Sequence, residues 1–279
     1  MPTLLHVQGL RVLHESSRFG GDNGITMTRQ NLIPEQAKLA FHLYCQLPFG
    51  RLHRGNPEVI ALANLIERSP SAVAMKLVNF ASLDPVITAS GRKGLSGASK
   101  LDQAIWDQFH ADWEGLVLEV NRIRHSLGDP AAVDDLQDED PLPDYSGQTR
   151  DQLVQQRIGQ TFFRRTVLSS YHGRCCITGL SEPRLLLASH IVPWGEDKAN
   201  RLNPRNGLCL SALYDRAFDQ GLITLDEDWR VVLSTALKEP KPPLQQHFQS
   251  VEGQRIELPE RFMPDSDLMQ LHRERIFLG

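Results

Sequence analysis

An acidic stretch that also contains proline divides this chain of 279 residues into two parts. Residues 129–149 contain seven Asp or Glu side chains, three prolines and no Lys or Arg. A segment with high charge and little apolar surface is typical of an exposed linker. We therefore expect a weakly structured segment over residues 1–27, a helical domain over 28–128, the acidic linker over 129–149 and a second domain over 150–279.

The composition limits the class of protein. Hydrophobic residues make up 41% of the chain, which is enough for packed cores. No apolar run approaches the length of a membrane span, and the first residues lack the pattern of a signal peptide, so we expect a cytoplasmic protein. The four cysteines do not form the pattern of a disulfide framework, and we expect Cys45 and Cys209 to be buried thiols.

The net charge of −4 does not describe how charge is distributed. Without the seven acidic groups of the linker, the remainder of the chain carries +3. Residues 145–181 contain five arginines and one aspartate. A local cluster can contact phosphates because exposed charges act over roughly 10 Å in salt. We expect Arg164 and Arg165 to contact DNA phosphates, and the alternative is a solvated helix face or a surface ion pair.

The first domain is predicted to be mainly helical. Helices are expected over 34–47, after Asn56, after Ser69 and over 99–126, because the apolar residues follow a helical period and start signals precede them. Two helices joined by a short turn favour a helix-turn-helix, and the Gly-rich loop over 88–99 would be the wing of a winged-helix DNA reader. The alternative is a helical scaffold or a dimerisation module. The side chains predicted to contact DNA are Lys76, Arg92 and Lys93.

The second domain is predicted to begin with a helix over 151–171 and a short strand and turn over 175–180. It is predicted to end with strands over 222–225 and 231–233 and a short helix over 268–277, in which His272 would supply surface charge. Between these segments the sequence predicts a strand, a polar loop and a helix. This strand ends at His190, and Asn206 follows the loop. Asp215 and Asp219 are four residues apart, so both carboxylates project from one face of the predicted helix. Two such carboxylates can share a hard divalent cation, while a nearby imidazole can deprotonate water. The amide of Asn206 can hold the backbone of the loop.

These residues resemble the HNH, or ββα-metal, endonuclease family. The likeness lies in Ala-Ser-His-Ile-Val-Pro at 188–193, Asn-Gly-Leu at 206–208 and Leu-Tyr-Asp-Arg-Ala-Phe-Asp-Gln-Gly at 213–221. It implies that His190 is the general base, that Asn206 supports the loop, and that Asp215 and Asp219 hold a divalent ion, with Mg²⁺ favoured over Mn²⁺.

Two positions depart from the pattern of that family. Ser189 stands where the family commonly has a metal-ligating Asp or His, and a serine is a poor ligand. The two Cys-x-x-Cys pairs that hold a structural zinc in many members are each half present, because Gly179 and Ala212 stand at the second positions. We therefore expect no structural zinc. We also expect Asp219 either to bind metal or to brace the end of its helix.

The N-terminal part also resembles a module of bacterial HNH restriction-type nucleases, through residues 48–53 and 76–85. Together these features predict an α+β protein that acts as a metal-dependent endonuclease on double-stranded DNA, in a restriction or phage-defence role that includes reading modified bases. Two copies are usually needed to cut both strands, which favours a homodimer. The alternatives are a non-catalytic DNA-binding regulator with a degenerate HNH fold, and a nuclease effector switched on by a sensor domain.

Overall fold

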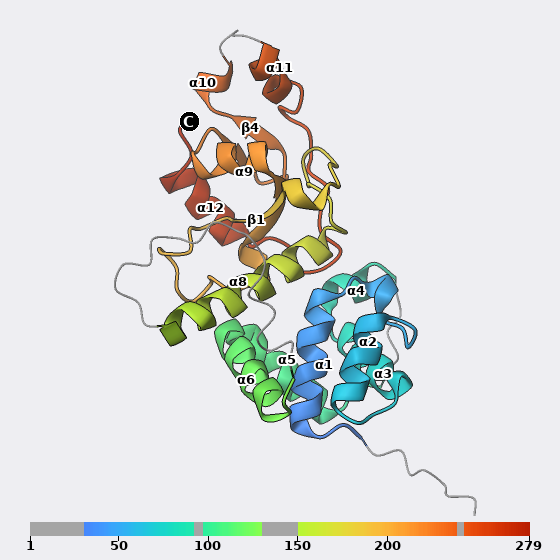
Figure 1. The fold of residues 1–279 in the computed structure, drawn as a ribbon. Coiled ribbons are helices and arrows are strands. Elements are labelled where there is room, and N and C mark those ends of the chain that lie inside the picture. The colour runs from blue at the N-terminus through green and yellow to red at the C-terminus, as the bar shows by residue number, and fades with distance from the viewer. Residues whose placement is uncertain (1–30, 92–96, 130–149, 239–242) are drawn as a thin grey trace, which may run out of the picture. The chain divides into compact units, whose positions relative to one another are not determined.

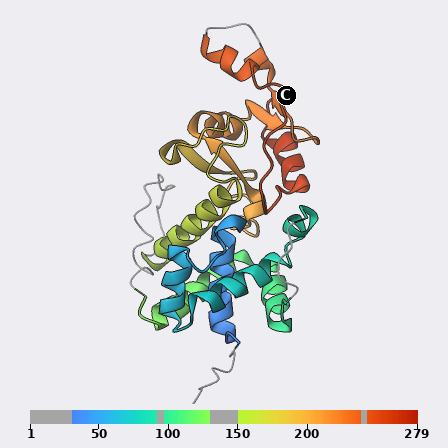
Figure 2. The same ribbon diagram turned by 90° about the vertical axis from the view of Figure 1, so that its right-hand side faces the viewer.

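A computed structural model of the chain describes residues 31–91, 97–129, 150–238 and 243–279. Residues 32–279 form one compact unit by their contacts, and Figures 1 and 2 show its elements from two sides. The segment expected over 1–27 and nearly all of the acidic linker lie outside the described residues. Among the described residues, no helix is both long enough and apolar enough to cross a membrane.

The N-terminal region consists of helices whose starts are set by local capping. Asn56 accepts a hydrogen bond from the backbone N–H of Glu58, and Ser69 accepts one from Ala72, which confirms both predicted starts. The core of this region surrounds Phe41, whose ring packs against several aromatic side chains. The elements are α1 (Pro34–Gln46), α2 (Pro57–Leu65), α3 (Pro70–Ala81), α4 (Pro85–Ala89), α5 (Lys100–Ala111) and α6 (Trp113–Ser126).

Two features of this region differ from the prediction. The single helix expected over 99–126 is broken at Asp112, whose backbone is not helical and whose side chain accepts a hydrogen bond from Gly115 N at 2.8 Å. This cap starts a second helix inside a continuous apolar pattern. Within residues 31–91 and 97–129 the structure contains helices and no strand, and α4 occupies the start of the expected wing loop. Arg92 and Lys93 lie outside the described residues.

The C-terminal region begins with α8 (Arg150–Ser170) and continues into a hairpin of β1 (Leu186–His190) and β2 (Gly207–Ser211). The strand expected near residues 175–180 is instead a turn, in which Gly179 adopts a φ of 72° and donates its N–H to Cys175 O. The strands expected near 222–225 and 231–233 are confirmed. The remaining elements are α9 (Ala212–Asp219), β3 (Ile223–Leu225), β4 (Val231–Leu233), α10 (Thr235–Lys238), α11 (Pro243–Gln249) and α12 (Ser266–Arg275).

Helix α8 packs closely against the hairpin and also contacts α1 and α6 (Figure 1). His190 and Gly207 are paired in the register of β1 and β2, so their side-chain positions share one face of the hairpin. A Cβ atom at Gly207 would lie 2.5 Å from a methyl of Val167 and 2.9 Å from the ring of Phe163. The absence of a side chain at residue 207 therefore allows α8 to approach the end of the hairpin that carries His190.

The two regions share buried contacts rather than a loose boundary. The ring of His42 on α1 stacks on Phe162 of α8, with centroids 5.0 Å apart. Arg261 is fully buried and donates hydrogen bonds to the backbone oxygens of Tyr44 and Cys45 and to the hydroxyl of Ser169. Because a buried guanidinium needs acceptors around it, this arginine fixes the C-terminal segment against both α1 and α8.

Candidate active site

The loop between β1 and β2 is held closed by Asn206, whose side chain is fully buried. Its Oδ1 accepts a hydrogen bond from Val192 N at 2.9 Å, and its Nδ2 donates to Val192 O at 3.1 Å and to Asn200 O at 3.2 Å. Its backbone oxygen accepts from Ile191 N. These contacts join the two ends of the loop, as the sequence predicted, and they fix the backbone directly after His190.

His190 stands at the end of β1 and packs between two aromatic side chains. Its ring is parallel to that of Phe163, with centroids 4.0 Å apart, and it meets the ring of Trp194 edge-on at 5.6 Å. Its Nε2 lies 3.0 Å from the backbone oxygen of Arg201. Burial lowers the pKa of His190 to about 4, although the Arg201 carbonyl raises it in part. The imidazole is therefore neutral at physiological pH and can accept a proton.

Ser189 lies on the opposite face of β1 from His190, because successive strand residues alternate between faces. Its side chain is 3% exposed, and its hydroxyl has no hydrogen-bond partner among the described residues. A buried hydroxyl without a partner carries a desolvation cost. The position at which the HNH resemblance led us to expect a metal ligand therefore holds a polar atom without a partner in the described part of the chain.

Helix α9 carries Asp215 and Asp219, and it contacts both strands of the hairpin. Asp215 is half-buried and Asp219 is exposed. The pKa of Asp219 is raised to about 6, mainly because the surrounding protein desolvates the carboxyl and also because Asp215 is negatively charged, while Arg216 opposes the shift. Desolvation is the largest cause of this shift, although the residue is exposed at the surface. The repulsion nevertheless indicates that the two carboxylates are close enough to interact.

This pair of carboxylates fits a hard divalent cation. A bound cation would relieve the repulsion that raises the pKa of Asp219, and carboxylate oxygens are the ligands such ions prefer. Within the described parts of the chain, no group of three or more His, Cys, Asp or Glu side chains is arranged to hold a metal. Protein ligands alone would leave the coordination of the ion incomplete, so water and phosphate would supply the remaining oxygens.

Three of the five basic side chains predicted to contact DNA lie within the described residues, and all three have partners within the protein. Lys76 is buried, and its ammonium lies 2.6 Å from a carboxylate oxygen of Asp102, so it cannot reach a DNA groove as predicted. Arg164 donates to Leu186 O at 2.9 Å and thereby braces the start of β1. Arg165 forms an ion pair with Glu58 of α2 at 2.8 Å.

Sequence reasoning missed two groups that support the site. The first is the carbonyl of Arg201, because a contact across an irregular loop leaves no periodic signal. The second is His272, which was expected to be surface charge but is fully buried. Its ring stacks on Phe218 at 3.8 Å, its Nε2 lies 3.2 Å from Phe218 O, and its Nδ1 lies 2.9 Å from the hydroxyl of Thr224. It therefore supports the end of α9 at Phe218, next to Asp219 in the sequence.

The hairpin followed by a helix, with His190, Asn206 and Asp215 in this order, defines a site of the ββα type. Residues 175–226 match the family model described as HNH endonuclease, so the C-terminal region contains an HNH-family domain. The match includes all of β1, the loop, β2 and α9. Members of this family are generally nucleases, and the domain indicates nuclease activity on DNA. No curated protein matches the chain.

Proposed function

We propose that this protein is a metal-dependent DNA endonuclease in which His190 activates the attacking water. The observation that carries this proposal is the hydrogen bond between His190 and the Arg201 carbonyl. A carbonyl oxygen only accepts, so Nε2 carries the proton in the neutral ring and Nδ1 keeps its lone pair. Nδ1 is therefore the atom that would take a proton from water, which would then attack phosphorus in the DNA backbone.

The protein's own residues prepare this step in three ways. Stacking on Phe163 and the contact with Trp194 fix the plane of the imidazole. Asn206 fixes the loop backbone, so it acts as a positioning residue rather than a proton carrier. Asp215 and Asp219 would hold one divalent ion, with Mg²⁺ favoured. When bound, that ion would offset negative charge on the phosphate and on the leaving oxygen.

The biological role that we propose is restriction or phage defence, with double-stranded DNA as substrate and a homodimer as the cutting species. It rests on the resemblance of residues 48–53 and 76–85 to a module of restriction-type HNH nucleases, beside the HNH match over residues 175–226, and fold likeness by itself does not determine function. Cleavage of unmodified, methylated and hydroxymethylated DNA side by side tests the preference for modified bases. Cutting of one form only would support that preference, and equal cutting of all three would contradict it.

The test of the proposed function is a supercoiled-plasmid assay with Mg²⁺ or Mn²⁺. His190→Ala should reduce nicking by about 100-fold or more, the range that general base catalysis supplies. Because His190 also stacks on Phe163, His190→Gln serves as a second variant that keeps most of the side-chain volume, and circular dichroism checks that both variants fold. Equal cutting by wild type and both variants would overturn the assignment of the base. Retained DNA binding without any cutting by wild type would favour the DNA-binding regulator.

A further inference from the structure

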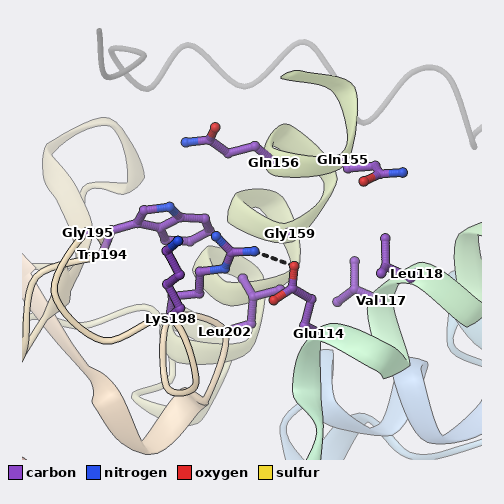
Figure 3. A pocket seen from close by; sticks show the side chains of 11 residues that line it. Glu114, Val117, Leu118, Gln155, Gln156, Gly159, Trp194, Gly195, Lys198 and Leu202 are labelled. Carbon is purple, nitrogen blue, oxygen red and sulfur yellow. Dashed lines mark hydrogen bonds and ion pairs between the residues drawn. The ribbon is translucent and has the colours of Figure 1, made fainter. Parts of the chain in front are cut away.

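A cavity of about 490 Å³ lies where α6, α8 and the loop after β1 meet (Figure 3). It is adjacent to the proposed base but separate from it. Trp194, which contacts His190, lines the cavity, and so does Arg201, whose carbonyl is bonded to His190. A volume in the range of roughly 300–1,000 Å³ is typical of sites for small organic ligands. Neither the proposed base nor the carboxylates of α9 line this cavity.

The side chains around the cavity present both apolar surface and groups suited to an anion. Val117 and Leu118 of α6 and Leu202 of the loop supply an aliphatic wall. Lys198 and Arg201 supply two positive charges against the single carboxylate of Glu114. The guanidinium of Arg201 already has two partners within the protein. It forms an ion pair with Glu114, and it lies 5.4 Å from the centre of the Trp194 ring. Phosphate is the kind of anion that such a paired and planar guanidinium can also bind.

Among the described residues, three polar groups at the cavity have no partner that would compete with a ligand. Lys198 is exposed, and neither it nor the amides of Gln155 and Gln156 make a hydrogen bond or ion pair with another described residue. Figure 3 shows Gln156 and Lys198 on the side of the cavity where Trp194 lies. An amide offers both donors and an acceptor, which suits the edge of a nucleobase.

We infer that this cavity binds a nucleotide, with its base against Trp194 and the aliphatic wall, its base edge near Gln156, and its phosphate near Lys198 and Arg201. The inference rests on the proposed function in one respect, since DNA would bring such a nucleotide to the site. Two sources share this chemistry. One is an unpaired base of the DNA next to the scissile phosphate, and the other is a free nucleotide.

Because of the position of the cavity, a bound nucleotide would affect the proposed base. A phosphate that takes Arg201 from Glu114 would move the loop residue whose carbonyl is bonded to His190. Glu114 belongs to α6, so this ion pair links the helical region directly to the loop that contacts the base. Nucleotide binding would therefore change the orientation of His190 as well as the affinity for DNA.

The experiment titrates dAMP, dGMP, dCMP and dTMP separately into the full chain in EDTA, and follows binding by calorimetry. At least one should bind saturably, whereas inorganic phosphate or the matching nucleoside should bind at least tenfold more weakly. Lys198→Ala and Gln156→Ala should each weaken binding at least fivefold. The matched controls are Lys100→Ala on α5 and Gln160→Ala on α8, which do not line the cavity and should bind as wild type does. No binding, or binding that both pairs of variants change alike, would overturn the inference.

A second arm distinguishes the two sources. A duplex with one extrahelical nucleotide is compared with the same duplex carrying an extrahelical abasic site. Tighter binding of the first, lost in Gln156→Ala, would support a DNA base as the occupant. Equal binding of both duplexes, together with saturable binding of a mononucleotide, would support a free nucleotide. EDTA prevents metal-dependent cutting, so the binding result does not depend on the plasmid assay. A protein that never cuts DNA could still bind the nucleotide in this experiment.

Discussion

The helical region and the HNH domain use their polar side chains in opposite ways. In the helical region, Lys76 is paired with Asp102, and the hydroxyl of Tyr44 donates to Asp84 at 2.8 Å, so these buried polar groups stabilise the fold. In the HNH domain, Ser189 has an unsatisfied hydroxyl among the described residues, and the charge of Asp215 disfavours that of Asp219. Polar groups that cost stability are frequent at functional sites. The unfavourable polar groups named here therefore lie at the candidate site, whereas those named in the helical region are paired.

The largest expected effect is on the buried ion pair of the helical region. Asp102→Asn should lower the free energy of unfolding by about 3–5 kcal/mol, because it leaves the Lys76 ammonium buried without an opposite charge. Urea unfolding followed by circular dichroism measures this loss. The cutting rate of the molecules that remain folded should be unchanged.

The control for this change is a surface pair in the same region. Lys38 lies 2.9 Å from Glu119, and both side chains are partly exposed, so Lys38→Met should cost less than about 1 kcal/mol. The double variant Lys76→Met with Asp102→Asn should recover part of the loss, because no buried charge then lacks its partner. Equal losses in the buried and the surface variants would contradict this account.

The second-largest effect is expected in the HNH domain, where a variant should lose cutting activity without losing stability. Asp215→Asn should reduce cutting by about 100-fold, which corresponds to about 2.7 kcal/mol of barrier, because the ion loses a charged ligand. In EDTA its free energy of unfolding should be equal to or above that of wild type, since the repulsion with Asp219 is removed. Plasmid cutting and urea unfolding measure the two quantities. Asp228→Asn, in the exposed turn between β3 and β4, is the matched control. A parallel loss of stability and activity would mean that Asp215 acts through the fold.

A third effect concerns the pH dependence of stability through His272. Burial lowers its pKa to about 4, the carbonyl of Phe218 raises it in part, and the nearby charge of Arg273 lowers it. The unfolded chain takes up this proton near pH 6.5, so the stabilisation is complete above that pH and is lost as pH falls towards 4. The loss should reach at most about 3 kcal/mol.

Urea unfolding at pH 7.5 and pH 5 measures this dependence. The groups packed around His272 from α9 and β3 are Phe218 and Thr224, and Arg273 is the neighbouring charge on its own helix. His272→Asn should reduce the difference between the two pH values. His125→Asn, at an exposed position on α6, should leave it intact. An unchanged difference in the His272 variant would show that other groups determine the loss.

The comparison also explains which features could be predicted from the sequence. Helix starts at Asn56 and Ser69 were predictable because a cap and the amide it binds are two or three residues apart. The break at Asp112 was missed, since the apolar pattern continues through it. The burial of Lys76 was missed because its partner, Asp102, is 26 residues away and charge alone predicts exposure.

In the candidate site, the motif led us to expect that the amide of Asn206 holds the loop, and the structure has hydrogen bonds between this amide and the backbone of Val192. The sequence could not predict that Nε2 of His190 is directed at the Arg201 carbonyl. That contact depends on the path of an irregular loop, whose backbone follows from packing against α6 and α8 rather than from a repeating pattern. The roles of His190, Asp215 and Asp219 in catalysis stay predictions until the variants are measured.

The smallest expected effect lies where the two regions meet, at the ion pair of Arg165 with Glu58. Both side chains are partly exposed, so Glu58→Gln should change the free energy of unfolding by less than about 1 kcal/mol, and less still in high salt. If Arg165 also contacts phosphate, the same variant should tighten DNA binding, because the carboxylate no longer competes for the guanidinium. The dependence of log K on log salt should then become steeper by up to about one counterion. Arg165→Gln should reduce that slope in return. If neither variant changes the salt dependence, the role of Arg165 is to hold α8 against α2. Its positive charge, like that of Lys76, would then stabilise the fold and would not bind the substrate.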